Sequence, residues 1–300
     1  MVLHTMQQPR SLGLLFALIA VSIWSGNFVI ASGFVHSLPP ITLAALRWVT
    51  AAIIFLPFCW KRIHRDLPAI MAHRWQILVA SITGVTLFNT LVYVSARTTD
   101  TTNMALFASS TPVFVVILSR IFLGEGISRA RAAGLLIAIC GMLTIATRGD
   151  LEILLAMTFR VGDIWMLLAG LLWAVYSILV KKMPSDIDPL SYLGTTFFIG
   201  AIPLIPAAFI EQQTAAAWSM SWPIAGAVLY LGLGASLAAF FLWNNAVRII
   251  GPGTASLFQY FMPVFSGVAA YFILGQPITF AHLAGFVLIF LGVFMATRLR

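Results

Sequence analysis

Polar and aromatic side chains recur within apolar stretches of this chain, where they could bind a small molecule. They are Trp24, Asn27, Asn89, Tyr93, Ser109, Trp173, Tyr176, Trp243, Asn244, Gln259 and Tyr260. Three pairs among them have the spacing of one helix face: Trp24 with Asn27, Asn89 with Tyr93, and Trp173 with Tyr176. Such faces combine flat apolar walls with hydrogen-bonding tips, which suits a neutral or aromatic zwitterion. The alternative is ordinary packing, in which Asn and Gln join helices inside a membrane.

Arg47 is the one charged residue that falls deep inside an apolar stretch. It lies seven residues past Pro40, roughly 10 Å from the end of a helix that begins there. A buried guanidinium normally faces protein or water. It could therefore anchor a substrate carboxylate, which its planar fork suits, or clamp backbone carbonyls or a loop carboxylate such as Asp100 or Asp163. The equivalent position in the second half of the chain is Thr196, so the charge is asymmetric.

Acidic residues and histidines are expected only in loops, in the terminal tail or near helix ends. Proton-driven pumps commonly use such groups at mid-membrane, and exporters of organic cations need negative charge there. The sequence therefore favours a facilitator or exchanger driven by the substrate's own gradient, although a relay through water, tyrosine or a helix-end Asp stays open. No cluster of metal ligands and no nucleophile–base pair is found, so we expect neither a metal, a cofactor nor an enzyme. Cys59 and Cys140 are interpreted as packing residues.

The elements that must position these residues are membrane helices. Of the 300 residues, 61% are hydrophobic and 9% are charged, whereas a soluble domain has about 25% charged residues. Continuous apolar runs near the roughly 20 residues that cross a bilayer predict an all-α membrane protein, because backbone groups in lipid must be paired within the segment. Ten such runs are predicted, at about 12–32, 39–60, 75–96, 101–123, 130–148, 163–181, 189–210, 223–246, 253–274 and 281–298.

The +8 net charge is distributed by side of the membrane. With the N-terminus inside, 13 Lys and Arg fall on the inner side and 3 on the outer side, with Arg47 within a helix. This asymmetry predicts cytoplasmic termini in the cell inner membrane, and no nucleic-acid partner.

The chain contains two copies of one unit. TPVFVVILSRIFLGE at 111–125 is repeated as MPVFSGVAAYFILGQ at 262–276, an offset of 151, and Trp24 pairs with Trp173 at an offset of 149. We therefore predict five-helix repeats at 1–149 and 161–300, joined by a linker at 150–160. An odd number of helices inverts the second copy, which is a signature of secondary transporters. The equivalent prolines Pro112 and Pro263 would kink the fourth and ninth helices, either as gates or merely to shape the bundle.

Several motifs together resemble the EamA-type branch of the drug/metabolite transporter superfamily. They are W-S-G-N-F at 24–28, Arg47 after Pro40, Y-V-S-A at 93–96, and S-T-P-V-F with F-L-G-E within 110–125. The resemblance implies ten helices, cytoplasmic termini and export of small metabolites from a central cavity. Among its members, the chain is most similar to bacterial exporters of aromatic and other neutral amino acids. The second copy has Gln276 in place of Glu125, so any role of that carboxylate belongs to one half.

The sequence thus predicts a secondary transporter that exports small neutral metabolites, above all amino acids, by alternating access. Its expected partners are the small-molecule substrate and the lipid bilayer, and the expected state is a monomer or weak dimer. The alternatives are an exporter of drugs or other metabolites, proton-coupled or not, and more distantly a membrane-embedded enzyme or a channel.

Overall fold

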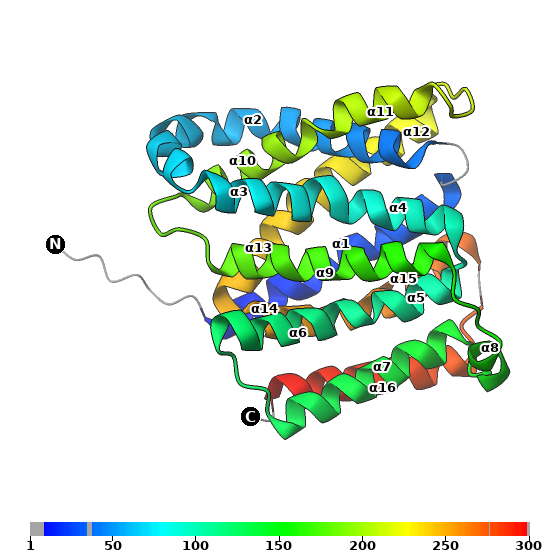
Figure 1. Ribbon diagram of the computed structural model, residues 1–300. Helices are drawn as coiled ribbons and strands as arrows, with labels where there is room; N and C mark the ends of the chain where they lie inside the picture. Colours follow the sequence, from blue (N-terminus) through cyan, green and yellow to red (C-terminus); the bar gives the residue numbers. More distant parts are fainter. Residues whose placement is uncertain (1–8, 35–37, 276, 299–300) are drawn as a thin grey trace.

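The computed structural model describes residues 9–34, 38–275 and 277–298, and the side chains at 27–34, 101 and 273–274 lie outside this description. Within these ranges the regular structure is entirely helical, with no strand (Figure 1). The predicted all-α membrane fold is confirmed. Eight helices or series of consecutive helices are long and apolar enough to cross a membrane, and α1 adds the shorter apolar stretch Arg10–Gly26.

Each predicted run corresponds to one helix or to a series of consecutive helices. In the first repeat these are α1 (Arg10–Phe34), α2 (Pro40–Ala72), α3 (Arg74–Ser81) with η1 (Ile82–Leu87) and α4 (Phe88–Thr98), α5 (Thr101–Ala108) with α6 (Ser110–Leu123), and α7 (Arg129–Ala146). The short α8 (Leu151–Leu155) follows. In the second repeat they are α9 (Val161–Lys181), α10 (Pro189–Ala201) with α11 (Leu204–Gln212), α12 (Trp222–Leu229) with η2 (Tyr230–Ala238) and α13 (Ala239–Ile250), α14 (Pro252–Leu257) with η3 (Phe258–Phe261) and α15 (Met262–Leu274), and α16 (Phe280–Arg298).

Local signals fix where these helices begin and end. Asp100 and Ser128 accept hydrogen bonds from the backbone N–H groups of Asn103 and Arg131, and so cap α5 and α7. Gly124 and Gly275, which are equivalent in the two repeats, end α6 and α15 with φ of 69° and 65°. Glycine adopts this left-handed conformation without the strain that a Cβ would add, so both repeats terminate this helix in the same way.

The helix α2 extends beyond its predicted end near residue 60. It continues to Ala72, and α3 begins at Arg74 almost without a loop. Asp66 consequently lies inside a helix, where its Oδ2 accepts from the Ser191 hydroxyl at 2.7 Å and from the Asp188 N–H at 2.9 Å. The prediction that every acidic residue lies in a loop or near a helix end is wrong for Asp66. The extension exists because docking onto the start of α10 satisfies this buried carboxylate.

Helices pack mainly across the two repeats rather than within them. The helix α1 contacts α13 and α15, α2 contacts α10 and α11, α9 contacts α4 and α6, and α7 contacts α16, which lies beside it in Figure 1. Glycines permit the α7–α16 contact: a Cβ on Gly141 would lie 2.8 Å from the carbonyl oxygen of Gly285. Small residues are the usual means of such close approach in membranes.

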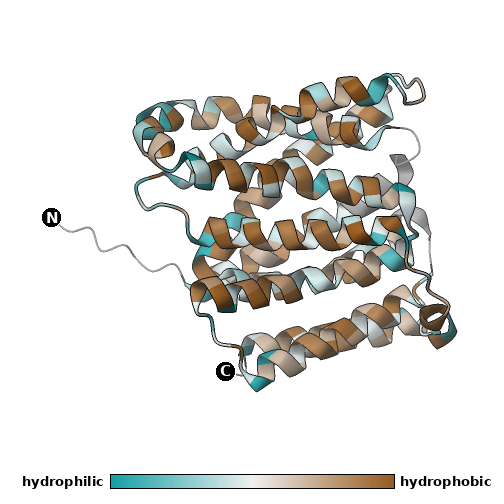
Figure 2. Cartoon of the chain, viewed as in Figure 1, coloured by the Kyte–Doolittle hydropathy of each residue, from teal (hydrophilic) through white to brown (hydrophobic). Residues whose placement is uncertain are grey.

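The outer faces of the bundle are apolar (Figure 2). Large side chains such as Leu136, Phe272 and Phe290 are exposed on them, which suits contact with lipid. The Arg10 guanidinium donates to the Thr297 carbonyl at 2.7 Å, so α1 begins where α16 ends. We call this the terminal side of the molecule, and the opposite side, where α4 ends and α5 begins, the far side.

Candidate functional site

A cavity of about 260 Å³ lies between the two repeats. Its walls come from α1, α4, α5, α6 and α7 of the first repeat and from α9, α13, η3 and α15 of the second. Met104, Ala146 and Met166, which line it, lie close to the far-side ends of their helices. The cavity therefore extends from the middle of the bundle toward the far side.

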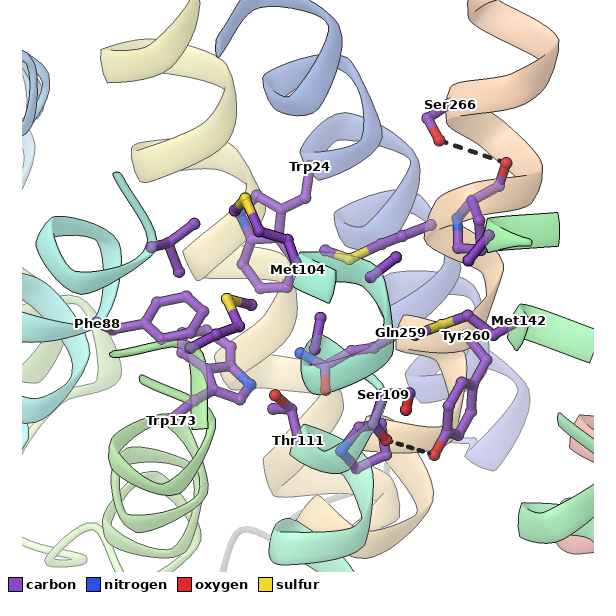
Figure 3. Close-up of a pocket in the computed structure, with 18 of the residues that line it drawn as sticks. Trp24, Phe88, Met104, Ser109, Thr111, Met142, Trp173, Gln259, Tyr260 and Ser266 are labelled. Carbon is purple, nitrogen blue, oxygen red and sulfur yellow. Dashed lines mark hydrogen bonds between the residues drawn. The ribbon is translucent and has the colours of Figure 1, made fainter. Parts of the chain in front are cut away.

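Flexible apolar side chains dominate the cavity wall. Four methionines line it, two from each repeat: Met104, Met142, Met166 and Met262. Phe88 and Trp173 add aromatic surface, and Met104 and Met142 flank the space in Figure 3. Methionine is unbranched and polarizable, so such a wall adapts to side chains of different shape. None of the described residues that line the cavity carries a charge.

Three polar atoms at this cavity have no hydrogen-bond partner among the described residues. They are the Nδ2 of Asn89, the Nε1 of Trp173 and the Oε1 of Gln259. Asn89 and Trp173 are buried, with exposed fractions of 5% and 0%. Buried polar groups are normally paired, and these two donors and one acceptor, which have almost no exposed surface, could be paired by a ligand once the lining side chains shift.

Arg47 lies behind the cavity wall rather than in it. Its Nη1 donates to Asn89 Oδ1 at 2.9 Å and to the Tyr93 hydroxyl at 3.0 Å, and its Nη2 donates to the Ala235 carbonyl at 2.9 Å. Its Nε donates to the Ser236 hydroxyl. The guanidinium also lies 5.1 Å from the centre of the Trp48 ring, within the range of a cation–π contact.

The loop carboxylates suggested as partners of Arg47 are satisfied elsewhere. Asp163 accepts from the Thr99 hydroxyl at 2.7 Å, from Asn103 Nδ2 at 2.9 Å and from the Arg160 N–H at 2.7 Å. Asp100 caps α5. The clamp onto a carbonyl is thus confirmed and the carboxylate partners were wrong. An effect of Arg47 on substrate stays a prediction, and in this conformation it would act through Asn89.

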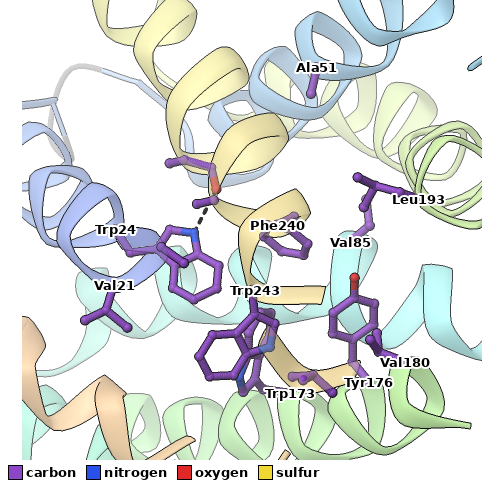
Figure 4. Packing of buried hydrophobic residues seen from close by; sticks show 14 of the residues in the cluster. Val21, Trp24, Ala51, Val85, Trp173, Tyr176, Val180, Leu193, Phe240 and Trp243 are labelled. Carbon is purple, nitrogen blue, oxygen red and sulfur yellow. Dashed lines mark hydrogen bonds between the residues drawn. The ribbon is translucent and has the colours of Figure 1, made fainter. Parts of the chain in front are cut away.

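Trp24, Trp173 and Phe240 line the cavity and belong to an aromatic cluster, shown in Figure 4, which we call the floor of the cavity. Trp24 packs edge to face against Trp173 at 5.3 Å and lies 5.7 Å from Phe240, and its Nε1 donates to the Ala235 carbonyl at 2.8 Å. Trp243 packs behind these residues and does not line the cavity, with its ring 5.5 Å from that of Trp173. Aromatic pairs in this geometry are worth about 0.5–1.5 kcal/mol beyond their burial. The floor of the cavity is accordingly a stiff surface, unlike its methionine walls.

The two predicted proline kinks both border the cavity. The fourth span is interrupted at Ser109, between the end of α5 at Ala108 and the start of α6 at Ser110, and the ninth is interrupted by η3. Pro112 and Pro263 occupy the first turn of the helices that follow, and both line the cavity. The Tyr260 hydroxyl donates to the Ser109 carbonyl at 2.9 Å, although these residues are equivalent in the two repeats. The pseudo-symmetry axis therefore passes between the two interruptions. A gating role of the prolines stays a prediction.

On the terminal side, the loop after α6 closes onto the start of α14. The Glu125 carboxylate accepts from the Gly253 N–H and lies 3.5 Å from Arg131 Nη1. Arg131 Nη2 donates to the Thr254 hydroxyl at 2.8 Å. Burial raises the pKa of Glu125, and the positive charges of Arg131 and Lys181 oppose that rise. This contact joins the repeats on the side where the cavity is absent.

The cavity brings together eight of the predicted residues: Trp24, Asn89, Ser109, Pro112, Trp173, Gln259, Tyr260 and Pro263. Arg47, Tyr93, Tyr176, Trp243 and Asn244 pack behind it, where the Tyr176 hydroxyl donates to Asn244 Oδ1 at 3.0 Å. The side chain of Asn27 lies outside the described residues. Sequence reasoning missed the four methionines, Phe88, Thr111 and Ser266, because apolar or small residues in an apolar run carry no signal of the direction they face.

Two inverted repeats around a central cavity define a class of membrane transporter. Residues 11–147 and 160–298 each match the EamA-like transporter family, so the chain belongs to that family and the predicted resemblance is confirmed. It is 27% identical over 289 residues to the uncharacterized transporter YyaM of Bacillus subtilis (strain 168), covering 96% of this chain and 94% of the relative. It is 23% identical over 283 residues to the protein PecM of Dickeya dadantii (strain 3937), covering 92% of this chain and 89% of PecM.

A solved crystal structure of a protein has the same fold. It superposes with a TM-score of 0.80, covers 96% of this chain and 97% of that one, and is 19% identical in sequence. The likeness extends over all the spans, so the arrangement of helices around the cavity is that of a known fold.

Proposed function

We propose that this protein is a secondary transporter that exports small neutral metabolites, above all aromatic and other neutral amino acids, by alternating access. The observation that carries the proposal is the cavity between the two repeats, whose described lining residues are uncharged and include Asn89, Trp173 and Gln259, each with one polar atom that has no partner among the described residues. An amino acid offers the complement: an apolar side chain beside a carboxylate and an ammonium group.

The size of the cavity favours a small metabolite over a drug. Pockets for drug-sized ligands measure about 300–1,000 Å³, and this one measures about 260 Å³. Its four methionines favour a range of apolar side chains over one fixed shape.

The absence of charge from the cavity lining favours transport down the substrate's own gradient. An organic cation would lose its hydration without gaining a carboxylate partner among the described lining residues. The excess of Lys and Arg on the terminal side supports cytoplasmic termini in an inner membrane, with the cavity directed outward.

Counterflow in proteoliposomes tests the proposal. Vesicles loaded with unlabelled phenylalanine are placed in labelled phenylalanine without any ion gradient, and saturable accumulation of label is expected, with competition by leucine and tryptophan. Protein-free vesicles are the control. An absolute requirement for a proton gradient would overturn the facilitator mechanism, and no accumulation by folded protein across an amino acid panel would overturn the substrate class. Linear, unsaturable entry would indicate a channel.

A further inference from the structure

We propose that the cavity recognises the carboxylate of its substrate through Asn89 Nδ2 and Trp173 Nε1, and that Arg47 is the positioning residue that directs the Asn89 donor toward it. This inference rests on the proposed function, which it deepens by naming the group that the site selects. A substrate of this site must then carry a carboxylate, and the corresponding amine without that group is excluded.

The orientation of the Asn89 amide follows from its contact with Arg47. A guanidinium has donors only, so the atom of Asn89 that lies 2.9 Å from Arg47 Nη1 must be the carbonyl oxygen. The NH₂ group is thereby turned away from Arg47, at a side chain that lines the cavity. Asn and Gln amides can otherwise be placed either way round, and Arg47 removes that freedom here.

Arg47 itself cannot move to accommodate an Asn89 amide that is placed the other way round. It is 1% exposed, and its guanidinium is held by Ser236, Ala235 and Tyr93 while it stacks on Trp48. Its planar fork is satisfied in one geometry, so the position of Asn89 Oδ1 is set by groups on α4 and η2 together with α2.

The second donor lies on the neighbouring wall. Trp173 packs on Phe88, the residue before Asn89, with ring centres 4.6 Å apart. Its buried Nε1 has no partner among the described residues, as is true of Asn89 Nδ2. Asn89 and Trp173 thus each carry a donor that lacks an acceptor, on side chains connected through Phe88, and two such donors suit the two oxygens of one carboxylate.

The unpartnered hydrogen-bond acceptor belongs to another wall of the cavity. Gln259 belongs to η3, and its side chain points toward Trp173 in Figure 3. Its Oε1 has no partner among the described residues. No hydrogen bond among the described residues fixes the Gln259 amide, so it can turn its Oε1 toward the ammonium group of a zwitterion whose carboxylate lies at Asn89 and Trp173.

The charge of Arg47 supports the same orientation of the substrate, with its carboxylate toward Asn89. None of the ion pairs formed by the described residues includes Arg47, and all of its hydrogen-bond partners are neutral. A buried positive charge without a carboxylate partner makes the adjoining cavity favourable for an anion. Asn89 passes this preference on, because its carbonyl oxygen faces the cation and its NH₂ group is turned away from it, on a side chain that lines the cavity.

Asn89→Asp is the principal test, because it replaces the NH₂ donor of the side chain by an acceptor oxygen and keeps the shape of the side chain. The aspartate still accepts from Arg47, and the cavity then meets an acceptor oxygen where it met a donor. The KM for phenylalanine in counterflow is expected to rise about 10- to 100-fold, the range for losing a hydrogen bond to a charged group. Inhibition by 2-phenylethylamine, which lacks the carboxylate, is expected to strengthen.

Trp173→Phe provides an independent variant with a matched control. It removes the Nε1 donor from the cavity and keeps an aromatic ring, and a rise in KM for phenylalanine of about tenfold is expected. Trp243→Phe is the control, because Trp243 is equally buried and also has an unpartnered Nε1 but does not line the cavity. The KM of Trp243→Phe for phenylalanine is expected to stay unchanged.

The positioning role of Arg47 is measured by selectivity rather than by rate. Arg47→Gln frees the Asn89 amide, so the preference for phenylalanine over 2-phenylethylamine as inhibitors is expected to fall about tenfold or more, with Arg47→Lys between that variant and wild type. A purely structural arginine would lower the melting temperature and the maximal rate and leave this ratio unchanged.

The outcomes separate the two proposals. If the wild type takes up phenylalanine and the variants Asn89→Asp and Trp173→Phe have unchanged KM and selectivity, carboxylate recognition is overturned. The proposed function then still stands. No uptake of phenylalanine or other amino acids by folded wild type overturns both. If Asn89→Asp fails to fold, Trp173→Phe against Trp243→Phe decides alone.

Discussion

The fourth and ninth spans behave differently on the two sides of the molecule. Near the interruptions both members of several equivalent pairs line the cavity, as Ser109 and Tyr260 do. Toward the far side only one member does: Met104 lines the cavity whereas its equivalent Ala255 is fully buried. Ser266 likewise lines it and its equivalent Val115 is fully buried.

This difference arises because α6 packs on α14 on the terminal side, whereas α5 and α15 flank the cavity on the far side. Two copies of one unit related by inversion would look alike from both sides if they were arranged symmetrically. The molecule is therefore in a conformation accessible from one side, and the hydrogen bond from Tyr260 to Ser109 lies where the two arrangements meet.

The largest expected effect is in water access to equivalent positions. In a chain with Cys59 and Cys140 replaced by alanine, Ser266→Cys is expected to react with a membrane-impermeant maleimide at least about tenfold faster than Val115→Cys. Labelling is followed by gel shift in intact vesicles of known orientation, with denatured protein as the measure of full reaction. Equal rates at both positions would show that the two sides are equally open in the resting protein.

Exchanging the residues of one equivalent pair sharpens the comparison. Ala255→Met places a large side chain in the closed contact and is expected to cost about 1–3 kcal/mol of stability, as overpacking usually does. Because Met104 is only partly buried and already borders the cavity, Met104→Ala is expected to cost less than Ala255→Met does, while it shifts competition toward bulkier amino acids. Melting temperature and counterflow competition measure the two effects. Equal destabilisation by both changes would contradict the one-sided opening.

Tyr260→Phe removes the hydrogen bond between the two interruptions. The expected loss is about 0.5–1.5 kcal/mol, and the transport rate should change because the contact lies where the two sides meet. Tyr271→Phe, at an exposed position on α15, is the control and should leave both unchanged. A full wild-type rate and melting temperature in Tyr260→Phe would mean that the contact does not bear on the exchange between conformations.

The smallest expected effect concerns the closed side and its dependence on pH. Burial raises the pKa of Glu125, so this carboxyl binds a proton more readily in the folded state than in the unfolded state. The ionised carboxylate therefore disfavours folding once the pH rises above the ordinary pKa of glutamate in the unfolded chain, about 4.3. Glu125→Gln should therefore melt slightly higher than wild type at pH 7, and the two curves should converge near pH 4. A lower melting point of the variant at pH 7 would show that Arg131 and Lys181 outweigh burial.

The sequence predicted the spans and their duplication well, because both depend on hydropathy along the chain and on direct repetition. It predicted the interruptions in the fourth and ninth spans from Pro112 and Pro263 alone. It did not predict that α2 continues past residue 60, because the satisfaction of Asp66 by Ser191 involves a helix more than a hundred residues away.

The composition of the site was predicted only in part, for a related reason. Tyr176 and Trp243 are as aromatic as Trp24 and Trp173 and lie at similar depth, yet only the latter two line the cavity. Hydropathy indicates how deep a residue lies and says nothing about rotation around the helix axis. That rotation is set by packing between helices of different repeats, which also determines that Arg47 meets Asn89 rather than Asp100 or Asp163.

The pairing of α7 with α16 has a consequence for how the chain is made. Gly141 enters the bilayer about 144 residues before its contact Gly285 is synthesised. At about 5–20 residues per second, that interval lasts on the order of ten to thirty seconds, during which the glycine face of α7 has no protein partner. The ribosome must therefore complete α16 before α7 can pack against it. The first repeat thus becomes fully packed at nearly the same time as the finished chain is released.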